Sequence, residues 1–237
     1  MAGLAGACIG SFLATVARRW EQGAGAALRG RSACDQCGST LGPIELLPVV
    51  GRMLLRGRCR HCGTRIPLTE TTVEAASAGV AILAVLMAPT AWFWLVILGW
   101  LLVLLATIDH LHGILPDPLN TALLMTGLLA VLFDATAPAP IDALLGGAVG
   151  AGAFALVAFG YEALRGRAGL GGGDVKLLGA LGVWVGLAGL PWIVLLAAAS
   201  ALVAAVATSG GRFEGSRAIR FGPWLAGAGF VVALVLR

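Results

Sequence analysis

The 237-residue chain is 59% hydrophobic and 12% charged, with a mean hydropathy of +0.93. A soluble domain carries about 25% charged residues, so this composition excludes a soluble globular protein. The net charge of +4 comes from a few basic loops and requires no nucleic-acid partner.

Apolar runs long enough to cross a membrane recur along the chain. Residues 92–108 and 191–208 contain no ionisable group, and hydrocarbon about 30 Å thick needs roughly 20 apolar residues in a helix. The pattern predicts an all-α polytopic membrane protein with about eight transmembrane helices: 1–17, 73–89, 91–108, 118–134, 141–161, 175–188, 190–208 and 221–236. Prolines mark the expected connections, including the one at Pro191.

The basic residues predict the orientation of these spans. Nine of the 16 Lys and Arg residues lie between the first two spans, from Arg18 to Arg65. All others except Arg237 flank two further loops: Arg165, Arg167, Lys176, Arg212, Arg217 and Arg220. Loops rich in Lys and Arg stay in the cytoplasm, so both termini are expected outside. The first run precedes its positive charges, which favours an uncleaved span over a signal peptide.

Three regions follow from this pattern. Residues 1–17 form the first span, residues 18–72 form a polar, Arg-rich and Cys-rich cytosolic insert, and residues 73–237 form a helical membrane body. Small residues in the body let helices pack closely in lipid, above all at 146–150. Asp134 and Asp142 fall in the expected outer loop, where they are predicted to be solvated charges.

Two Cys-x2-Cys pairs predict a metal site in the insert. Cys34 and Cys37 are separated from Cys59 and Cys62 by 21 residues, a spacing that suits four thiolates around one structural zinc ion. Disulfides or a redox pair are the alternatives, but disulfides are rare in the cytosol. An insert this small buries little apolar surface, so a metal would supply much of its folding free energy.

Two aspartates, called the dyad below, occupy borders of the membrane body. Asp109 follows the third span, and Asp174 ends the run Gly171-Gly172-Gly173-Asp174 before the sixth span. The orientation predicted from Lys and Arg places both carboxylates at the cytoplasmic border. Adjacent carboxylates share a proton, so one can deprotonate water while the other donates to a carbonyl oxygen. This is the chemistry of an aspartyl protease, and solvated helix ends are the alternative.

Four further residues are candidates for binding substrate or tuning the dyad. Gly171 and Gly173 carry no side chain and let a substrate backbone approach Asp174. Lys176 either anchors its span or tunes Asp174. Asp117 is expected mainly to cap the N-terminus of the fourth span.

Taken in order, these motifs resemble those of the type IV prepilin peptidases, bifunctional leader peptidases and N-methyltransferases of bacterial inner membranes. The resemblance covers nearly the whole chain: Gly10-Ser11-Phe12-Leu13, the Cys pairs with residues 55–63, Asp109, Leu115-Pro116-Asp117 and the GxGD motif ending at Asp174. It implies cleavage of the basic leader of prepilins or pseudopilins after a Gly, on the cytoplasmic side, by Asp109 and Asp174. It also implies N-methylation of the new N-terminus from S-adenosylmethionine, an activity associated with the insert.

The first span and the insert depart from that family's pattern at several positions. Ala14 stands for the usual Asn, Glu21 for a common Pro, Val50-Gly51-Arg52 for a Leu-Ser-Trp-like segment and Glu70-Thr71 for Tyr-Pro. None of these positions belongs to the dyad. The departures therefore bear on methyl transfer rather than on proteolysis.

Two other functional classes fit part of the pattern. A proton-coupled membrane transporter would carry acids near the middle of its spans, whereas Asp109 and Asp174 lie at one border. A membrane-anchored zinc interaction module would use the membrane body only as a scaffold. Removing either aspartate would then leave its function intact. Under the peptidase interpretation, the substrate would belong to a pilus, a secretion-system pseudopilus or a competence filament.

Overall fold

The computed structural model describes the chain except for residues 24–32, 35, 43–44, 46, 167–168 and 210–219. Five residues that bear on the predicted orientation lie outside the described residues: Arg29, Arg31, Arg167, Arg212 and Arg217. The chain divides into two compact units, Met1–Pro89 and Thr90–Arg237. Every regular element in the described ranges is a helix, which confirms the all-α prediction.

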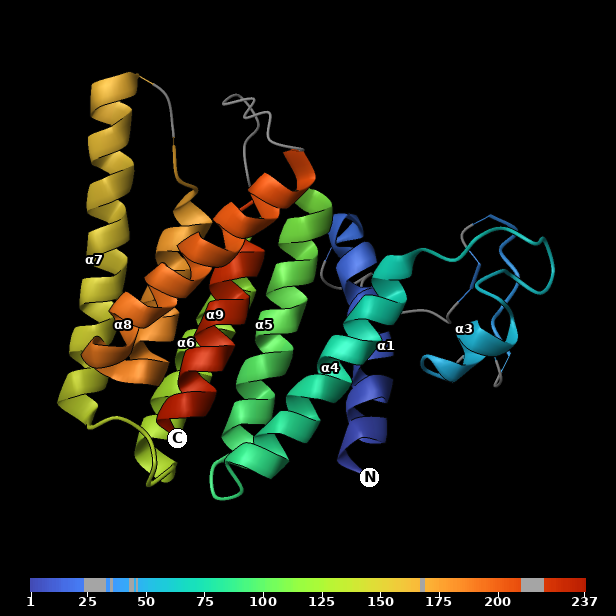
Figure 1. Ribbon diagram of the computed structural model, residues 1–237, viewed down its shortest axis with the longest axis horizontal. Helices are drawn as coiled ribbons and strands as arrows, with labels where there is room; N and C mark the ends of the chain where they lie inside the picture. Colours follow the sequence, from blue (N-terminus) through green and yellow to red (C-terminus); the bar gives the residue numbers. More distant parts are fainter. Residues whose placement is uncertain (24–32, 35, 43–44, 46, 167–168, 210–219) are drawn as a thin grey trace. The chain divides into compact units, whose positions relative to one another are not determined.

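The first unit consists of two apolar helices and the cysteine-rich insert. Helices α1 (Ala2–Arg18) and α4 (Leu68–Met87) lie side by side (Figure 1). Between them in the chain come the 3-10 turn η1 (Trp20–Gln22) and the short helix α3 (Val50–Leu54).

Two residues that depart from the family pattern form polar contacts within this unit. Arg52 of α3 donates a hydrogen bond to the Ile66 carbonyl oxygen at 2.9 Å. Glu70 of α4 forms an ion pair with Arg18 of α1 at 2.9 Å. These contacts connect the insert to α4 and α4 to α1, so the departures have structural roles here.

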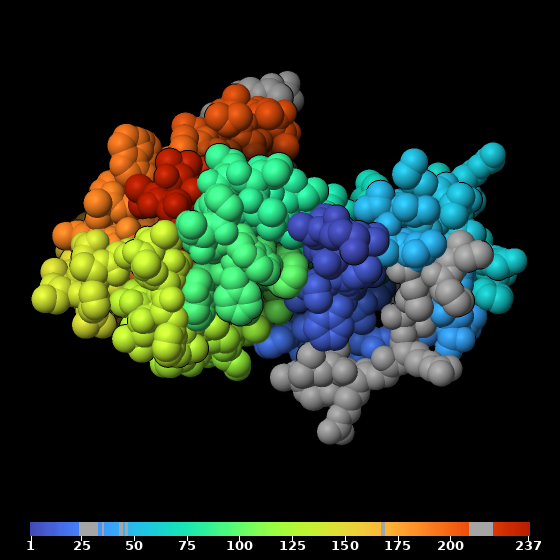
Figure 2. Space-filling model, turned by 90° about the horizontal axis from the view of Figure 1, so that it is seen from below, coloured from blue at the N-terminus to red at the C-terminus, as the bar shows by residue number. Residues whose placement is uncertain are grey.

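In the described residues the second unit comprises five helices. They are α5 (Trp92–His112), α6 (Asp117–Phe133), α7 (Pro140–Arg165), α8 (Gly172–Ser209) and α9 (Gly222–Leu236). Helix α8 packs against α6, α7 and α9, and Figure 2 shows the red end of α9 against orange atoms of α8. A Cβ on Gly146 would lie 2.4 Å from the Gly182 carbonyl oxygen. The backbones of α7 and α8 therefore touch, as the small residues predicted.

Helix α8 is broken at Gly186, where φ is 71° and ψ is −176°. Its two halves run in opposite directions (Figure 1). Asp142 Oδ1 accepts a hydrogen bond from the Leu187 N–H at 3.1 Å, which satisfies a backbone group at the break. A Cβ on Gly186 would lie 2.1 Å from Asp142 Oδ2, so only glycine fits. The prediction of a connection at Pro191 is therefore wrong, because the chain reverses before Pro191. Asp142, predicted as a solvated charge, is half-buried and accepts this exposed hydrogen bond at the reversal.

The eight predicted apolar runs are helical, but two of them share α8. Within the described ranges, four helices are able to cross a membrane by length and composition, namely α4, α5, α7 and α8. Helices α1, α6 and α9 are shorter, with 17, 17 and 15 residues. A straight α8 of 38 residues would be about 57 Å long, almost twice the thickness of the hydrocarbon. The reversal at Gly186 divides α8 into two shorter helical segments.

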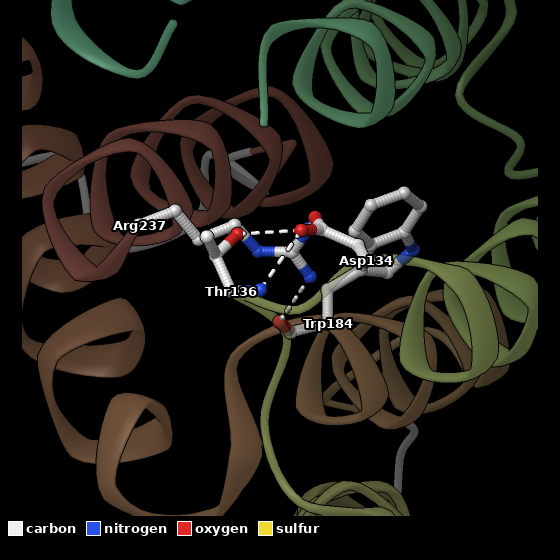
Figure 3. Close-up of polar contacts among 4 residues, drawn as sticks. All are labelled: Asp134, Thr136, Trp184 and Arg237. Carbon is white, nitrogen blue, oxygen red and sulfur yellow. Dashed lines mark hydrogen bonds and ion pairs between the residues drawn. The ribbon is translucent and has the colours of Figure 1, made fainter. Parts of the chain in front are cut away.

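A buried ion pair ties the end of α9 to the segment between α6 and α7 (Figure 3). Arg237 Nη1 lies 2.6 Å from Asp134 Oδ2, and the two side chains are 2% and 4% exposed. Thr136 donates to Asp134 Oδ1 from its backbone N–H at 2.9 Å and its hydroxyl at 2.7 Å. Arg237 also donates to the Trp184 carbonyl oxygen at 3.2 Å. The prediction of a solvated Asp134 is therefore wrong.

Arg237→Met is expected to lower the free energy of unfolding by about 3–5 kcal/mol, because it leaves Asp134 as an unpaired buried charge. The matched control is the double variant Asp134→Leu with Arg237→Met, which removes both charges and should recover most of the loss. Unfolding measured in one detergent compares both variants with the parental protein. Equal losses in the single and double variants would show that the ion pair is not the stabilising contact.

Candidate active site and metal centre

The dyad residues lie at the ends of two helices of the second unit. Asp109 is in the last turn of α5 and Asp174 is in the first turn of α8. They are only 7% and 9% exposed, and their charges interact. Asp109 Oδ2 and Asp174 Oδ1 have no hydrogen-bond partner among the described residues. The structure thus brings together two buried carboxylates, each with an oxygen that can accept a proton or a hydrogen bond.

Leu115 and two glycines bring the helix ends together around the dyad. A Cβ on Gly173 would lie 2.7 Å from Leu115 Cβ, and one on Gly222 would lie 3.3 Å from Leu115 Cδ1. The same Cβ on Gly222 would lie 2.6 Å from Asp109 Oδ2. Any side chain at Gly222 would therefore displace the Asp109 carboxylate. The start of α9 is thus part of this site, which the sequence motifs did not predict.

A cation also lies beside the dyad, although Arg220 was predicted only as an orientation signal. Arg220 donates a hydrogen bond to the His110 carbonyl oxygen, and its charge acts on Asp109. Asp174 instead faces the charge of Asp109. The two carboxylates therefore have different electrostatic surroundings. The sequence feature that could have pointed to Arg220 and Gly222 is their position at the start of an apolar helix.

The other candidate residues lie near the start of α6 and α8. Asp117 and Lys176 pair with each other at 2.6 Å, with side chains 68% and 54% exposed. The N-cap position of α6 is Pro116, and no side chain caps it, so the predicted capping role of Asp117 is wrong. Gly171 accepts a hydrogen bond from the Asp174 N–H at 3.0 Å. An exposed ion pair contributes little to stability, which leaves Asp117 and Lys176 able to exchange partners.

The four cysteines of the insert form one cluster in the first unit, with all sulfur atoms within 4.8 Å of one another. The Sγ atoms of Cys34 and Cys62 are 3.7 Å apart, and those of Cys37 and Cys59 are 4.0 Å apart. Sulfurs bound tetrahedrally to zinc at about 2.3 Å are about 3.8 Å from one another. The cluster therefore fits a single metal ion. All four thiols are free, so the disulfide alternative is not realised.

Hydrogen bonds prepare two of these thiols to lose their protons. Side-chain and backbone hydrogen bonds with Ser39 lower the pKa of Cys37 to about 6. Backbone hydrogen bonds, first that of Cys62, lower the pKa of Cys59. The Thr64 backbone hydrogen bond lowers the pKa of Cys62, but desolvation and the neighbouring thiols raise it to about 12. Since metals bind thiolates, metal binding would release the protons that the thiols still carry.

A cavity of about 230 Å³ lies within the first unit, beside α1, the start of α4 and the insert. Its lining includes Arg18 and three glutamates, Glu45, Glu70 and Glu74. Glu74 accepts a hydrogen bond from the Val49 N–H at 2.8 Å. Glu45 Oε1 is buried without a hydrogen-bond partner among the described residues. S-adenosylmethionine carries a carboxylate and two cationic groups, so this lining of mixed charge fits it.

Comparison with known proteins matches both units. The model of the bacterial peptidase A24 N-terminal domain matches residues 4–88, and that of the type IV leader peptidase family matches residues 95–206. These two ranges fall on either side of the boundary between the units. No solved structure matches the chain.

Several curated relatives are similar to most of the chain. Three of them, from Burkholderia, Aeromonas and Neisseria, are named prepilin leader peptidase/N-methyltransferase. That of Burkholderia pseudomallei (strain K96243) is 40% identical over 84% of this chain and 65% of its own length. Those of Aeromonas salmonicida (strain A449) and Neisseria gonorrhoeae are 35% and 30% identical, over 86% and 85% of this chain and 71% and 70% of their own. The chain thus spans about two thirds of these relatives. It belongs to the type IV leader peptidase family.

Proposed function

We propose that the chain is a membrane-embedded aspartic peptidase that removes the leader of prepilins or pseudopilins at the cytoplasmic face of the bacterial inner membrane. The observation that carries this proposal is the dyad, two buried carboxylates whose charges interact and which retain unpaired oxygens. Ionisable groups inside an apolar helical protein are costly and are typical of functional sites. The names of the relatives supply the class of substrate.

The surroundings of the dyad suggest a role for each carboxylate. We assign Asp109 as the base that takes a proton from the attacking water, because the cationic Arg220 donates a hydrogen bond to the carbonyl oxygen of the adjacent residue, His110. We assign Asp174, the second buried carboxylate, as the acid that donates a proton to the carbonyl oxygen of the scissile peptide. The tetrahedral intermediate returns this proton to Asp174 as the C–N bond breaks, and Asp109 protonates the departing amine. The pair titrates as one unit.

The transporter and zinc-module alternatives have less support. Asp109 and Asp174 lie at the ends of α5 and α8 rather than at their centres. A proton path across a membrane requires ionisable groups at greater depth. A zinc interaction module with a passive membrane scaffold would gain nothing from two costly buried carboxylates.

We also propose the eight-span topology, with two spans from α8 and the dyad at the cytoplasmic border. The Lys and Arg distribution supports the orientation, and the reversal at Gly186 supports the count. A topology reporter fused after Arg31 is expected to read cytoplasmic, and one inserted beside Ala137 is expected to read external. Reporter activity in the bacterial inner membrane measures both. The opposite result at either position would refute the orientation.

We propose that the cysteine cluster holds one structural zinc ion. Purified protein should contain about one zinc per chain. The double variant Cys34→Ser with Cys37→Ser should lose the metal and melt at a lower temperature, because the metal supplies folding free energy. Cys8→Ser is the matched control, since Cys8 lies in α1 and outside the cluster. Elemental analysis and thermal melts measure these effects, and parental protein free of zinc would contradict the assignment.

The names of the relatives include a second activity, N-methyl transfer. We propose that the cavity of the first unit is the S-adenosylmethionine site for this activity. Arg18 would hold the carboxylate of the cofactor, and Glu45 would hold a cationic group. When bound, S-adenosylmethionine supplies an activated methyl group for the new N-terminal amine. Substrate that is cut but never methylated would count against this second activity alone.

Asp109→Asn and Asp174→Asn are each expected to slow leader cleavage by roughly 10²–10⁴-fold, because each removes a titrating proton while keeping the shape. Glu162→Gln is the matched control: it changes an exposed carboxyl group of α7 outside the dyad and should cleave at the parental rate. Co-expression with a prepilin from the same genome, followed by mass spectrometry of the substrate N-terminus, reports cleavage and methylation together. Parental-rate cleavage by either Asn variant, at normal membrane levels, would refute the dyad mechanism.

A further inference from the structure

A groove of about 510 Å³ lies on the second unit between α6 and α7, with α8 as its floor. Helices α6 and α7 both pack against α8 but scarcely against each other, which leaves room for the groove. Sites that bind drug-sized ligands enclose about 300–1,000 Å³. The groove is therefore large enough to hold part of another chain.

The lining of the groove is mainly apolar and follows helical spacing. Helix α7 contributes Gly147, Ala148 and Ala151, which are neighbours on one helix face. Helix α8 repeats this spacing from Lys176 to Val183, and α6 contributes positions from Asp117 to Leu128, about 16 Å along its axis. Small residues of this kind let a second helix backbone approach closely in lipid.

One end of the groove lies at the starts of α6 and α8, and the first turn of α8 also carries Asp174. Asp117 and Lys176 line this end and form the exposed ion pair described above. Lys176 is only two positions after Asp174 in the first turn of α8. The rest of the groove runs away from the dyad along the apolar parts of the three helices. A chain that fills the groove would therefore end at the same helix turn of α8 that carries Asp174.

Asn120 adds an unused hydrogen-bond acceptor to this groove. It lies on α6, lines the groove and is 4% exposed. Its Nδ2 donates to the Leu115 carbonyl oxygen at 3.4 Å, but its Oδ1 has no partner among the described residues. In the described part of the second unit, the other buried side-chain oxygens without a partner belong to the dyad. An unpaired amide oxygen in an apolar site is unfavourable until a ligand donates to it.

We propose that the substrate has an apolar helix directly after its cleavage site, that this groove binds that helix, and that Asn120 accepts a hydrogen bond from the backbone where the helix unwinds. The inference rests on the proposed peptidase function. Attack by water requires extended backbone at the scissile bond, so the first N–H groups of the adjoining helix lose their intrahelical partners. In an apolar environment these groups need another acceptor. Asn120 supplies one, and it bonds to Leu115, which packs against Gly173 directly before Asp174.

Filling the groove tests its occupant. Ala148→Phe places a ring at an exposed groove position, whereas Ala153→Phe places the same ring at an exposed position of α7 outside the groove. Ala148→Phe is expected to reduce cleavage of full-length prepilin at least about tenfold, because it displaces the substrate from the dyad. Ala153→Phe should cleave at the parental rate. Equal rates in the two variants would overturn the proposal.

Asn120→Leu tests the proposed hydrogen bond. The substitution removes an unpaired buried oxygen, so the melting temperature should not fall. Cleavage should fall about tenfold, and Asn120→Thr, whose hydroxyl can accept a hydrogen bond, should recover part of the rate. A melting temperature that falls together with activity would show that Asn120 has only a structural role.

Photo-crosslinking separates docking from catalysis. A benzophenone side chain at position 148 of the Asp174→Asn variant is expected to capture prepilin on irradiation, and the same group at position 153 is not. Capture of prepilin, together with a parental protein that never cuts it, would support docking and refute the peptidase. Cleavage by the parental protein without capture at position 148 would refute docking alone. Capture of phospholipid alone would identify a lipid site and overturn the proposal.

Discussion

Polar groups inside an apolar helical protein must find their partners within the protein, because water is excluded. The second unit depends on this constraint. At the break in α8, Asp142 accepts a hydrogen bond from the Leu187 N–H. At the end of α9, Arg237 forms a buried ion pair with Asp134. At the other end of the unit, buried oxygens of the dyad and of Asn120 stay unpaired among the described residues. At the first end only Arg237 Nε lacks a partner among the described residues, whereas the second end keeps unpaired acceptors that water and substrate can use.

Helix α9 connects these two ends. Arg237 follows its last residue and pairs with Asp134, while Gly222 begins it and lies against Asp109. Its 15 residues form a helix about 22 Å long. Because the helix is rigid along its axis, fixing Arg237 also restricts where Gly222 can lie. The buried ion pair therefore contributes to the geometry around Asp109 without touching the dyad.

Sequence patterns predicted those features that a residue type or spacing carries by itself. The cysteine spacing predicted the sulfur cluster, and the apolar runs predicted the helices. Asp109 and Asp174 were singled out from their positions, and in the structure their charges interact. Asp134 could not be assigned in this way, because its partner Arg237 lies 103 positions away. Asn120 could not be singled out from the sequence either. Its distinguishing feature is a buried oxygen without a partner among the described residues, which only the packed helices reveal.

The unpaired oxygens also bear on how such an enzyme would select its substrate. A bacterial membrane holds many apolar helices that are not to be cut, and each keeps its N–H groups bonded within the helix. Such a helix can fill the groove but offers no N–H to Asn120 and no open peptide to the dyad. A helix whose first turn unwinds at the border satisfies both, and removes the cost of about 1–3 kcal/mol of an unpaired buried group. Recognition would then depend on where a helix begins as well as on its side chains.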